Sequence, residues 1–129
     1  MRIRQFDKAF EVLARVEEAD QDQKFLKKQA EHQATAGNLP DAIKSIERAL
    51  VTDNTRADLW VLKAGYHRAD YNIVRAQGSI GRALTTSPDS YAVLLENARI
   101  KKAQGRTKEY QDILHGILES LKKDYRKML

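Results

Sequence analysis

The chain has 129 residues, enough for one domain with a continuous core, and it has no cysteine, which excludes disulfides and thiolate metal sites. No stretch approaches the ~20 consecutive apolar residues of a membrane helix, so we expect no membrane span. The net charge of +5 is confined to the last quarter. Residues 1–98 hold 14 basic and 14 acidic residues, whereas residues 99–129 hold 9 basic and 4 acidic ones. Such a basic segment attracts nucleic acid, anionic membrane or acidic peptide when it is not simply a solvated helix face.

The N-terminus carries charges every few residues and has no apolar core segment, so the sequence predicts no signal peptide. If Met1 is the natural start, this favours a cytoplasmic location. A chain cut from a larger protein or assembly would leave the compartment open.

Apolar residues recur at spacings of three and four along most of the chain, which predicts helices and no strands. We expect seven helices in a single domain, 1–129. They cover residues 5–19, 22–36, 39–52, 56–69, 73–86, 89–104 and 107 to the chain end. The last six form three helix pairs, at 22–55, 56–88 and 89–129, and the helix at 5–19 is an N-terminal half-repeat that caps the array or lacks its own partner.

Residues that end or begin helices separate these segments. Gly37 and Gly105 can adopt the positive φ that ends a helix, and Pro40 fits the first turn of the next one. The run from Ser87 to Asp89 combines an N-cap hydroxyl, a proline and an acid, so it predicts the start of the helix at 89–104.

The same skeleton of residues returns every 34 positions. Large residues share one register, and so do small ones: Leu26, Trp60 and Leu94; Ile46, Ile80 and Leu114; Ala30, Ala64 and Ala98; Ala42 and Ala76; Ala49 and Ala83. Tyr71 stands where Gly37 and Gly105 place a glycine. A fixed period of this size predicts stacked helical hairpins, with the alanines allowing close approach of neighbouring helices.

The middle repeat shows this pattern most completely, with Trp60, Ala64, Ala76, Ile80, Ala83 and Pro88. These residues resemble the tetratricopeptide repeat (TPR) family, whose pattern is W-x2-L-G-x2-Y, then A-x3-F, a small residue and a proline. Lys63 and His67 depart from it. The resemblance covers residues 22–122 and implies an all-α, right-handed superhelical array of antiparallel helix pairs. The first helices of such an array line a concave groove that binds peptides or proteins.

By that resemblance, the groove residues are Lys24, Lys27, Glu31, Asp58, Val61, Arg68, Leu95, Arg99 and Lys102. Five are basic and two are acidic, so we expect an acidic peptide whose charge is read by Arg68, Arg99 and Lys102. The alternative is a solvated, unoccupied face. Reversing the charge of Arg68 and Arg99 together is expected to abolish binding without unfolding the chain.

The sequence shows no catalytic constellation. The three histidines are not at metal-ligand spacing, no glycine-rich phosphate loop is present, and Trp60 falls in the packing register rather than on a stacking surface. We therefore expect no enzyme, no metal and no cofactor.

Three functions remain open from the sequence. The first is a protein–protein interaction scaffold or adaptor. The second is nucleic-acid binding by the basic last quarter, which is disfavoured because tyrosines and basic residues do not recur once per hairpin. The third is a homo-oligomer formed through the end helices. The apolar stripe of the last helix continues about two turns past the end of a repeat, and it either caps the core or meets a partner.

Overall fold

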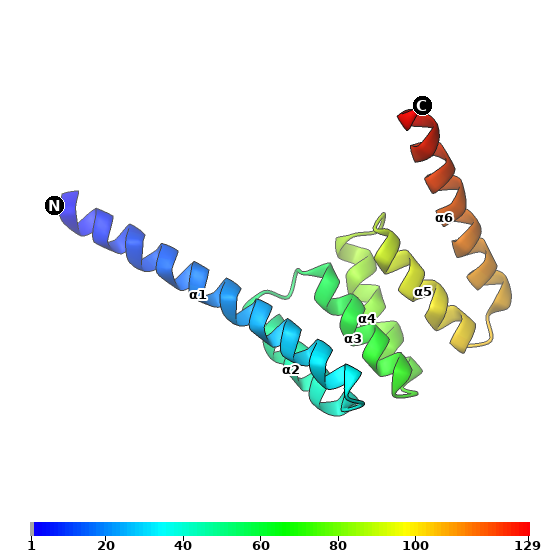
Figure 1. Ribbon diagram of the computed structural model, residues 1–129, viewed down its shortest axis with the longest axis horizontal. Helices are drawn as coiled ribbons and strands as arrows, with labels where there is room; N and C mark the ends of the chain where they lie inside the picture. The colour runs from blue at the N-terminus through cyan, green and yellow to red at the C-terminus, as the bar shows by residue number, and fades with distance from the viewer. Residues whose placement is uncertain (1) are drawn as a thin grey trace. The chain divides into compact units, whose positions relative to one another are not determined.

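The computed structural model describes the backbone of residues 2–129 and the side chains of residues 8–129. Residues 2–129 form six α-helices and no strand (Figure 1). The helices are α1 (Arg2–Thr35), α2 (Leu39–Thr52), α3 (Ala57–Ala69), α4 (Ile73–Thr86), α5 (Tyr91–Ala103) and α6 (Thr107–Met128). The chain divides into two compact units, Met1–Asn54 and Thr55–Leu129. No helix in this described part is long and apolar enough to cross a membrane.

The N-terminal unit is a pair of packed helices, α1 and α2 (Figure 1). The expected break between residues 19 and 22 is absent, so the helices predicted at 5–19 and 22–36 form one helix, and the described residues contain six helices rather than seven. Residues 20–23 are Asp-Gln-Asp-Gln and include no glycine or proline to end a helix. An ion pair of 3.1 Å between Asp20 and Lys24 also spans this point at the spacing that supports a helix.

A buried glutamine on α1 marks the end of its contact with α2. Gln23 Nε2 donates to the carbonyl oxygens of Ala49 and Asp53, at 3.2 and 3.3 Å. These carbonyls belong to the C-terminal end of α2, where helix backbone acceptors have no intrahelical partner. The part of α1 that precedes Gln23 therefore extends beyond α2.

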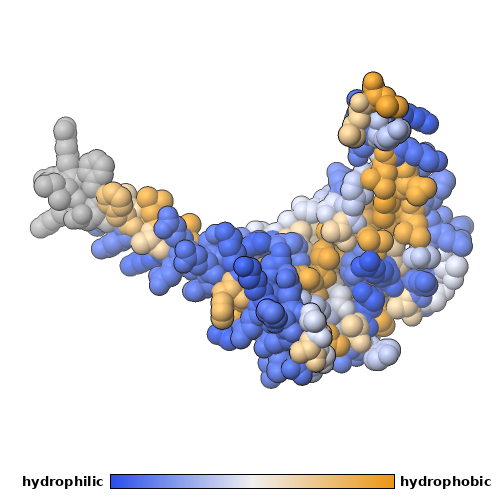
Figure 2. Space-filling model, viewed as in Figure 1, coloured by the Kyte–Doolittle hydropathy of each residue, from blue (hydrophilic) through white to orange (hydrophobic). Residues whose placement is uncertain are grey.

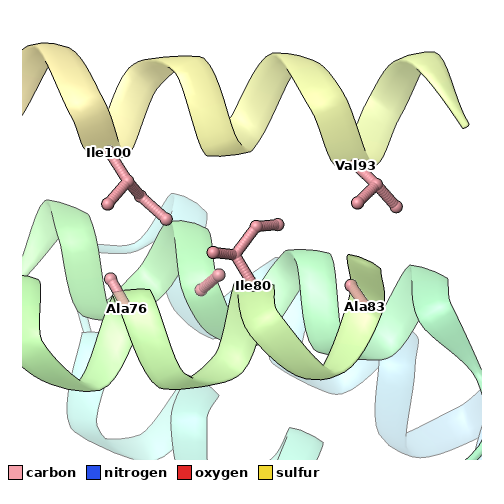
Figure 3. Close-up of a cluster of buried hydrophobic side chains, with 6 residues drawn as sticks. Ala76, Ile80, Ala83, Val93 and Ile100 are labelled. Carbon is pink, nitrogen blue, oxygen red and sulfur yellow. The ribbon is translucent and has the colours of Figure 1, made fainter. Parts of the chain in front are cut away.

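The C-terminal unit contains two further helix pairs, α3 with α4 and α5 with α6, and α5 also packs against both α3 and α4. Its core cluster of buried side chains comprises Ala64, Ala76, Ile80, Ala83, Val93 and Ile100. Figure 3 shows Ile80 pointing from α4 toward α5, from which Val93 and Ile100 point back. Trp60 and Val61 pack against this cluster from α3, which confirms the prediction that Trp60 belongs to the core.

The 34-residue period is visible in the burial of the side chains. Ile46 and Ile80 are fully buried, and so are the alanines that share a register: Ala30, Ala64 and Ala98; Ala42 and Ala76; Ala49 and Ala83. The larger residues Leu26, Trp60, Leu94 and Leu114 are half-buried. In the last hairpin, Tyr110 and Ile117 replace the alanines and are only half-buried. The predicted distribution of small and large residues is thus the one that packs the helices.

The turn between the two helices of each pair is the same in all three pairs. Gly37, Tyr71 and Gly105 have φ of 86°, 60° and 76°. After each, the next residue donates its backbone N–H five residues back: Asn38 to Gln33 at 2.8 Å, Asn72 to His67 at 2.8 Å and Arg106 to Lys101 at 2.9 Å. This is the Schellman ending of a helix, which favours glycine at the residue with positive φ. Tyr71 adopts this strained conformation, and because it is 93% exposed, few packing contacts compensate for the strain.

Replacing Tyr71 with glycine is expected to stabilise the C-terminal unit by about 0.5–1 kcal/mol. Relief of roughly 1–2 kcal/mol of left-handed strain outweighs the flexibility that glycine adds to the unfolded chain, roughly 0.5–1 kcal/mol. Urea unfolding of the full chain measures the change. Gly105→Ala is the matched control and should shift stability in the opposite direction. A lower midpoint for Tyr71→Gly would show that the tyrosine side chain makes contacts that outweigh the strain.

Helix boundaries follow the predicted ones closely at three helices. Helices α2 and α4 cover the predicted residues, and α6 begins at Thr107 as predicted. Helix α5 begins at Tyr91 rather than at 89, because Ser87–Asp89 forms a turn closed by a 3.4 Å hydrogen bond from Ser90 N to Ser87 O. Helix α3 begins at Ala57 rather than at 56.

Helix α6 leaves much of its apolar stripe uncovered. Tyr110, Ile113, Leu114 and Ile117 are half-buried, and the stripe continues as exposed Leu118, Leu121, Tyr125 and Met128. Of the two expected roles of this overhang, capping of the core is therefore wrong, because its apolar side chains are exposed. A hydrogen bond of 2.7 Å from Tyr91 Oη to Asp124 Oδ2 ties the overhang to the first turn of α5.

This hydrogen bond raises the pKa of Tyr91 above its ordinary value of 10.0, first because the neutral phenol donates to Asp124 and further through desolvation and repulsion by the carboxylate. A raised pKa means that the contact stabilises the fold below the ordinary pKa and is lost as pH rises through the raised value. Titration of phenolate absorbance should show one tyrosine ionising late, and Asp124→Asn should bring it back toward 10.0. Asp112→Asn on the same helix is the control. Identical titrations of all three proteins would contradict the contact.

Candidate binding cleft

An open cleft of about 660 Å³ lies within the C-terminal unit, where the ends of α3 and α5 meet the start of α4. Its lining residues are Arg68, Tyr71, Ile73, Arg99, Lys102 and Ala103. Arg68 and Lys102 lie in the last turns of α3 and α5. The C-terminal end of a helix carries partial negative charge, which favours cations at these two positions. Three of the predicted groove residues, Arg68, Arg99 and Lys102, are thus brought together.

A buried carboxylate holds the two arginines of the cleft. Glu96 on α5 has a side chain that is only 5% exposed. Its Oε1 accepts a 2.6 Å hydrogen bond from Arg68 Nε, and its Oε2 accepts bonds of 3.5 and 3.4 Å from Arg68 and Arg99. A buried charge is tolerated only when it is paired and hydrogen-bonded in this way. Because Arg68 comes from α3 and Glu96 from α5, the pair also links these two helices.

The cleft keeps a positive charge after this pairing. Arg68, Arg99 and Lys102 supply three positive charges and Glu96 one negative charge, which leaves two. A guanidinium has five N–H donors, so Glu96 does not exhaust either arginine. Tyr71, Ile73 and Ala103 add apolar surface to the same cleft. The arrangement fits a ligand that carries negative charge beside an apolar or aromatic group.

Lys102 differs from the arginines because it takes no part in holding Glu96. Its ammonium lies 5.5 Å from the centre of the Tyr110 ring on α6. This cation–π contact orients the side chain without neutralising its charge. Lys102 is therefore the cation of the cleft whose removal should disturb the fold least.

The other predicted groove residues of the C-terminal unit do not line the cleft. The carboxylate of Asp58 is engaged by Arg56 at 2.7 Å, and Val61 packs against the core cluster. Leu95 is exposed on α5. These three positions match the repeat register, but the structure gives the first two local structural roles.

The remaining predicted residues lie in the N-terminal unit, on α1. Lys24 is exposed and pairs with Asp20, and Lys27 is half-buried. Glu31 is exposed and borders a shallow hollow of about 270 Å³ along the same helix, together with Lys28, His32 and Thr35.

Two residues of the cleft were not predicted from the sequence: Tyr71, which adds an aromatic surface, and Glu96, which binds both arginines. Tyr71 was read only as a turn residue, although its departure from the glycine register was the available signal. The burial of Glu96 has no signal in the sequence, because a glutamate in an amphipathic helix ordinarily faces solvent. His67 is also buried, at 4% exposure, so it does not present a surface for a ligand.

No group of three or more His, Cys, Asp or Glu side chains within residues 8–129 lies close enough to hold a metal ion. No known family model matches the chain, and no curated protein matches it in sequence. The class of protein is therefore described from its fold and its cleft alone. The protein is an all-helical chain of packed helix pairs in a repeat-like arrangement, with a basic cleft where two of these pairs meet.

Proposed function

We propose that the chain is a protein-interaction module of the tetratricopeptide type, which binds an acidic peptide segment of a partner protein in this cleft. The observation that carries the proposal is the convergence of Arg68, Arg99 and Lys102, from two helices 34 positions apart in register, on one open cleft. Arg99 and Lys102 lie one turn apart on α5, and the packing of α3 against α5 brings Arg68 to them.

The repeat assignment is supported by three features of the described residues. The alanines and isoleucines that share a register are buried alike, the three turns share one geometry, and α5 packs on both helices of the preceding pair. A right-handed superhelix with a concave groove is the expected result of adding such pairs.

An acidic partner is supported by the charge of the cleft, and a binding role is supported by the backbone strain at Tyr71. Charged hydrogen bonds from arginine to carboxylate are about twice as strong as neutral ones, and they need donors held in place. Glu96 holds Arg68 and Arg99 in this way. A residue kept in a strained conformation is a feature found at binding sites, and Tyr71 lies at this cleft with φ of 60°.

Nucleic-acid binding fits the basic last quarter less well, because several of its cations already have acidic partners. The ion pairs are Arg99 with Glu96, Lys101 with Glu109, Arg106 with Glu109, and Lys122 with Glu119. A nucleic-acid backbone along this quarter would meet Glu109 and Glu119 beside these cations, whereas the cleft keeps a net positive charge after Glu96 is counted.

The double charge reversal at Arg68 and Arg99 is not a clean test of binding. It would surround buried Glu96 with two further carboxylates and unfold the unit for reasons unrelated to a ligand. Lys102→Glu is the better variant, since Lys102 does not contact Glu96. Lys108→Glu, an exposed residue outside the cleft, makes the same change in net charge.

The test is a fluorescence titration of the full chain with a labelled Asp- and Glu-rich peptide that contains one aromatic residue. We expect binding, weakened about tenfold or more by Lys102→Glu and little by Lys108→Glu, which corresponds to about 1.4 kcal/mol. Equal effects of the two variants would show non-specific charge attraction. A labelled oligonucleotide is the second arm: tighter binding of it, with steep loss between about 50 and 200 mM salt, would favour the nucleic-acid function instead.

A further inference from the structure

The N-terminal part of α1 carries an apolar face that α2 does not reach. Within the N-terminal unit, Gln23 and Ala30 are buried. The same face continues backward at seven-residue spacing through Val16 and Ala9. Beside it lie Phe10, Val12 and Leu13, and each is more than half exposed. The packing face of α1 therefore continues past its partner and is left open over residues 8–20.

The C-terminal part of α6 likewise carries an exposed apolar face. Its half-buried residues contact the unit up to Ile117, and the stripe then continues as Leu118, Leu121, Tyr125 and Met128. Figure 2 shows hydrophobic side chains gathered along α6 and again at its C-terminal tip. None of the α6 residues is buried, so the last hairpin has a side that no further helix covers.

The charges that flank the two open faces are opposite. Residues 8–20 carry four acids against two bases, a net charge of −2, namely Glu11, Glu17, Glu18 and Asp20 against Lys8 and Arg15. Residues 118–129 carry four bases against two acids, a net charge of +2, namely Lys122, Lys123, Arg126 and Lys127 against Glu119 and Asp124. The two faces are also similar in length, about 18–20 Å at 1.5 Å per residue.

We propose that these faces bind each other between two copies of the chain, with the open face of α1 (residues 8–20) on the open face of α6 (residues 118–129). The two apolar stripes have similar lengths and can bury each other. The opposite flanking charges favour contact of an α1 face with an α6 face. Contact of α1 with α1 brings two acidic faces together, and contact of α6 with α6 brings two basic faces together, so both are disfavoured.

This contact is heterologous, because it uses a different surface on each copy. After pairing, one copy keeps its open α6 face and the other keeps its open α1 face, so a third copy can add at either end. The assembly therefore grows with concentration, and the stacking of helices continues from one chain to the next. The inference does not depend on the ligand of the cleft.

Light scattering of the full chain over a range of concentrations is the first test. The mean mass should rise continuously past that of a dimer, and added salt should weaken the association because opposite charges flank the faces. A mass that stays at one chain at every concentration would overturn the proposal. A mass that stops at two chains would overturn the open-ended growth, because the faces would then close reciprocally or pair like with like.

Complementation of two variants is the sharper test. Leu13→Glu with Val16→Glu blocks the α1 face, and Leu121→Glu with Tyr125→Glu blocks the α6 face. Each variant alone should be monomeric, and an equimolar mixture should give a dimer and nothing larger, because one intact face remains on each partner. Val51→Glu and Val74→Glu, at exposed positions on α2 and α4, are the controls and should assemble like the native chain.

Circular dichroism establishes that each variant is folded, as expected for substitutions at exposed positions. If the α1 variant is monomeric while the α6 variant still assembles, or the reverse, the contact joins like faces and the proposal is wrong. A mixture that remains monomeric, with both variants folded, overturns it in the same way.

Discussion

Replacing Ile80 with alanine should lower the free energy of unfolding of the C-terminal unit by about 2–5 kcal/mol. Ile80 is fully buried between α4 and α5, where Val93 and Ile100 face it (Figure 3). Truncation removes the methyl and methylene groups that fill this space, and the alanines around it have no side-chain length with which to close the cavity. The cost should therefore lie toward the upper part of that range.

Urea unfolding of the full chain, followed by circular dichroism, measures this loss. Val74→Ala is the matched control on the same helix, since Val74 is 84% exposed, and it should change stability by less than about 0.5 kcal/mol. A loss for Ile80→Ala no larger than that of the control would mean that α4 and α5 are not packed through this residue.

Replacing Arg68 with alanine should destabilise the C-terminal unit by about 2–3 kcal/mol. The substitution removes the 2.6 Å partner of a carboxylate that is 5% exposed and leaves only the longer contact from Arg99. The larger part of the cost is the buried charge of Glu96, which the more distant and half-exposed Arg99 compensates only in part. The partial exposure of Arg68, at 32%, keeps the expected value below that of a fully buried pair.

A second substitution separates this cause from loss of arginine packing. Glu96→Gln added to Arg68→Ala removes the stranded charge and should recover more than half of the lost stability. Arg75→Ala, at an exposed position on α4, is the control for loss of an arginine side chain. If Glu96→Gln recovers nothing, the ion pair is not the reason that Arg68 matters.

The local features of the fold were predictable from the sequence. The spacing of apolar residues located α2 and α4, and the 34-residue register predicted which alanines and isoleucines are buried. It also predicted that Tyr71 occupies a position where its neighbours have glycine, and all three residues indeed have positive φ. These features depend on interactions within a few turns of helix or between adjacent helices. The same interactions recur in each 34-residue repeat.

Two features were not predictable: the continuation of α1 through residues 20–23, and the pairing of side chains that are far apart in the sequence. Two helices were expected before residue 37. The segment between them is polar but contains no residue that ends a helix, and the ion pair between Asp20 and Lys24 supports the helix there. Likewise, the family resemblance predicted Arg68 and Arg99 as ligand-binding residues, and only the structure shows that buried Glu96 binds both. Charges that the sequence assigns to a ligand can thus have a structural role in the fold.

The most direct test of cleft binding is an NMR titration of the isotope-labelled chain with the acidic peptide. Binding in the cleft predicts that the backbone amide resonances of Arg68, Tyr71, Arg99 and Lys102 shift together and saturably, and that these shifts are lost in Lys102→Glu. Shifts confined to residues 118–129, or shifts that grow linearly without saturation, would contradict it.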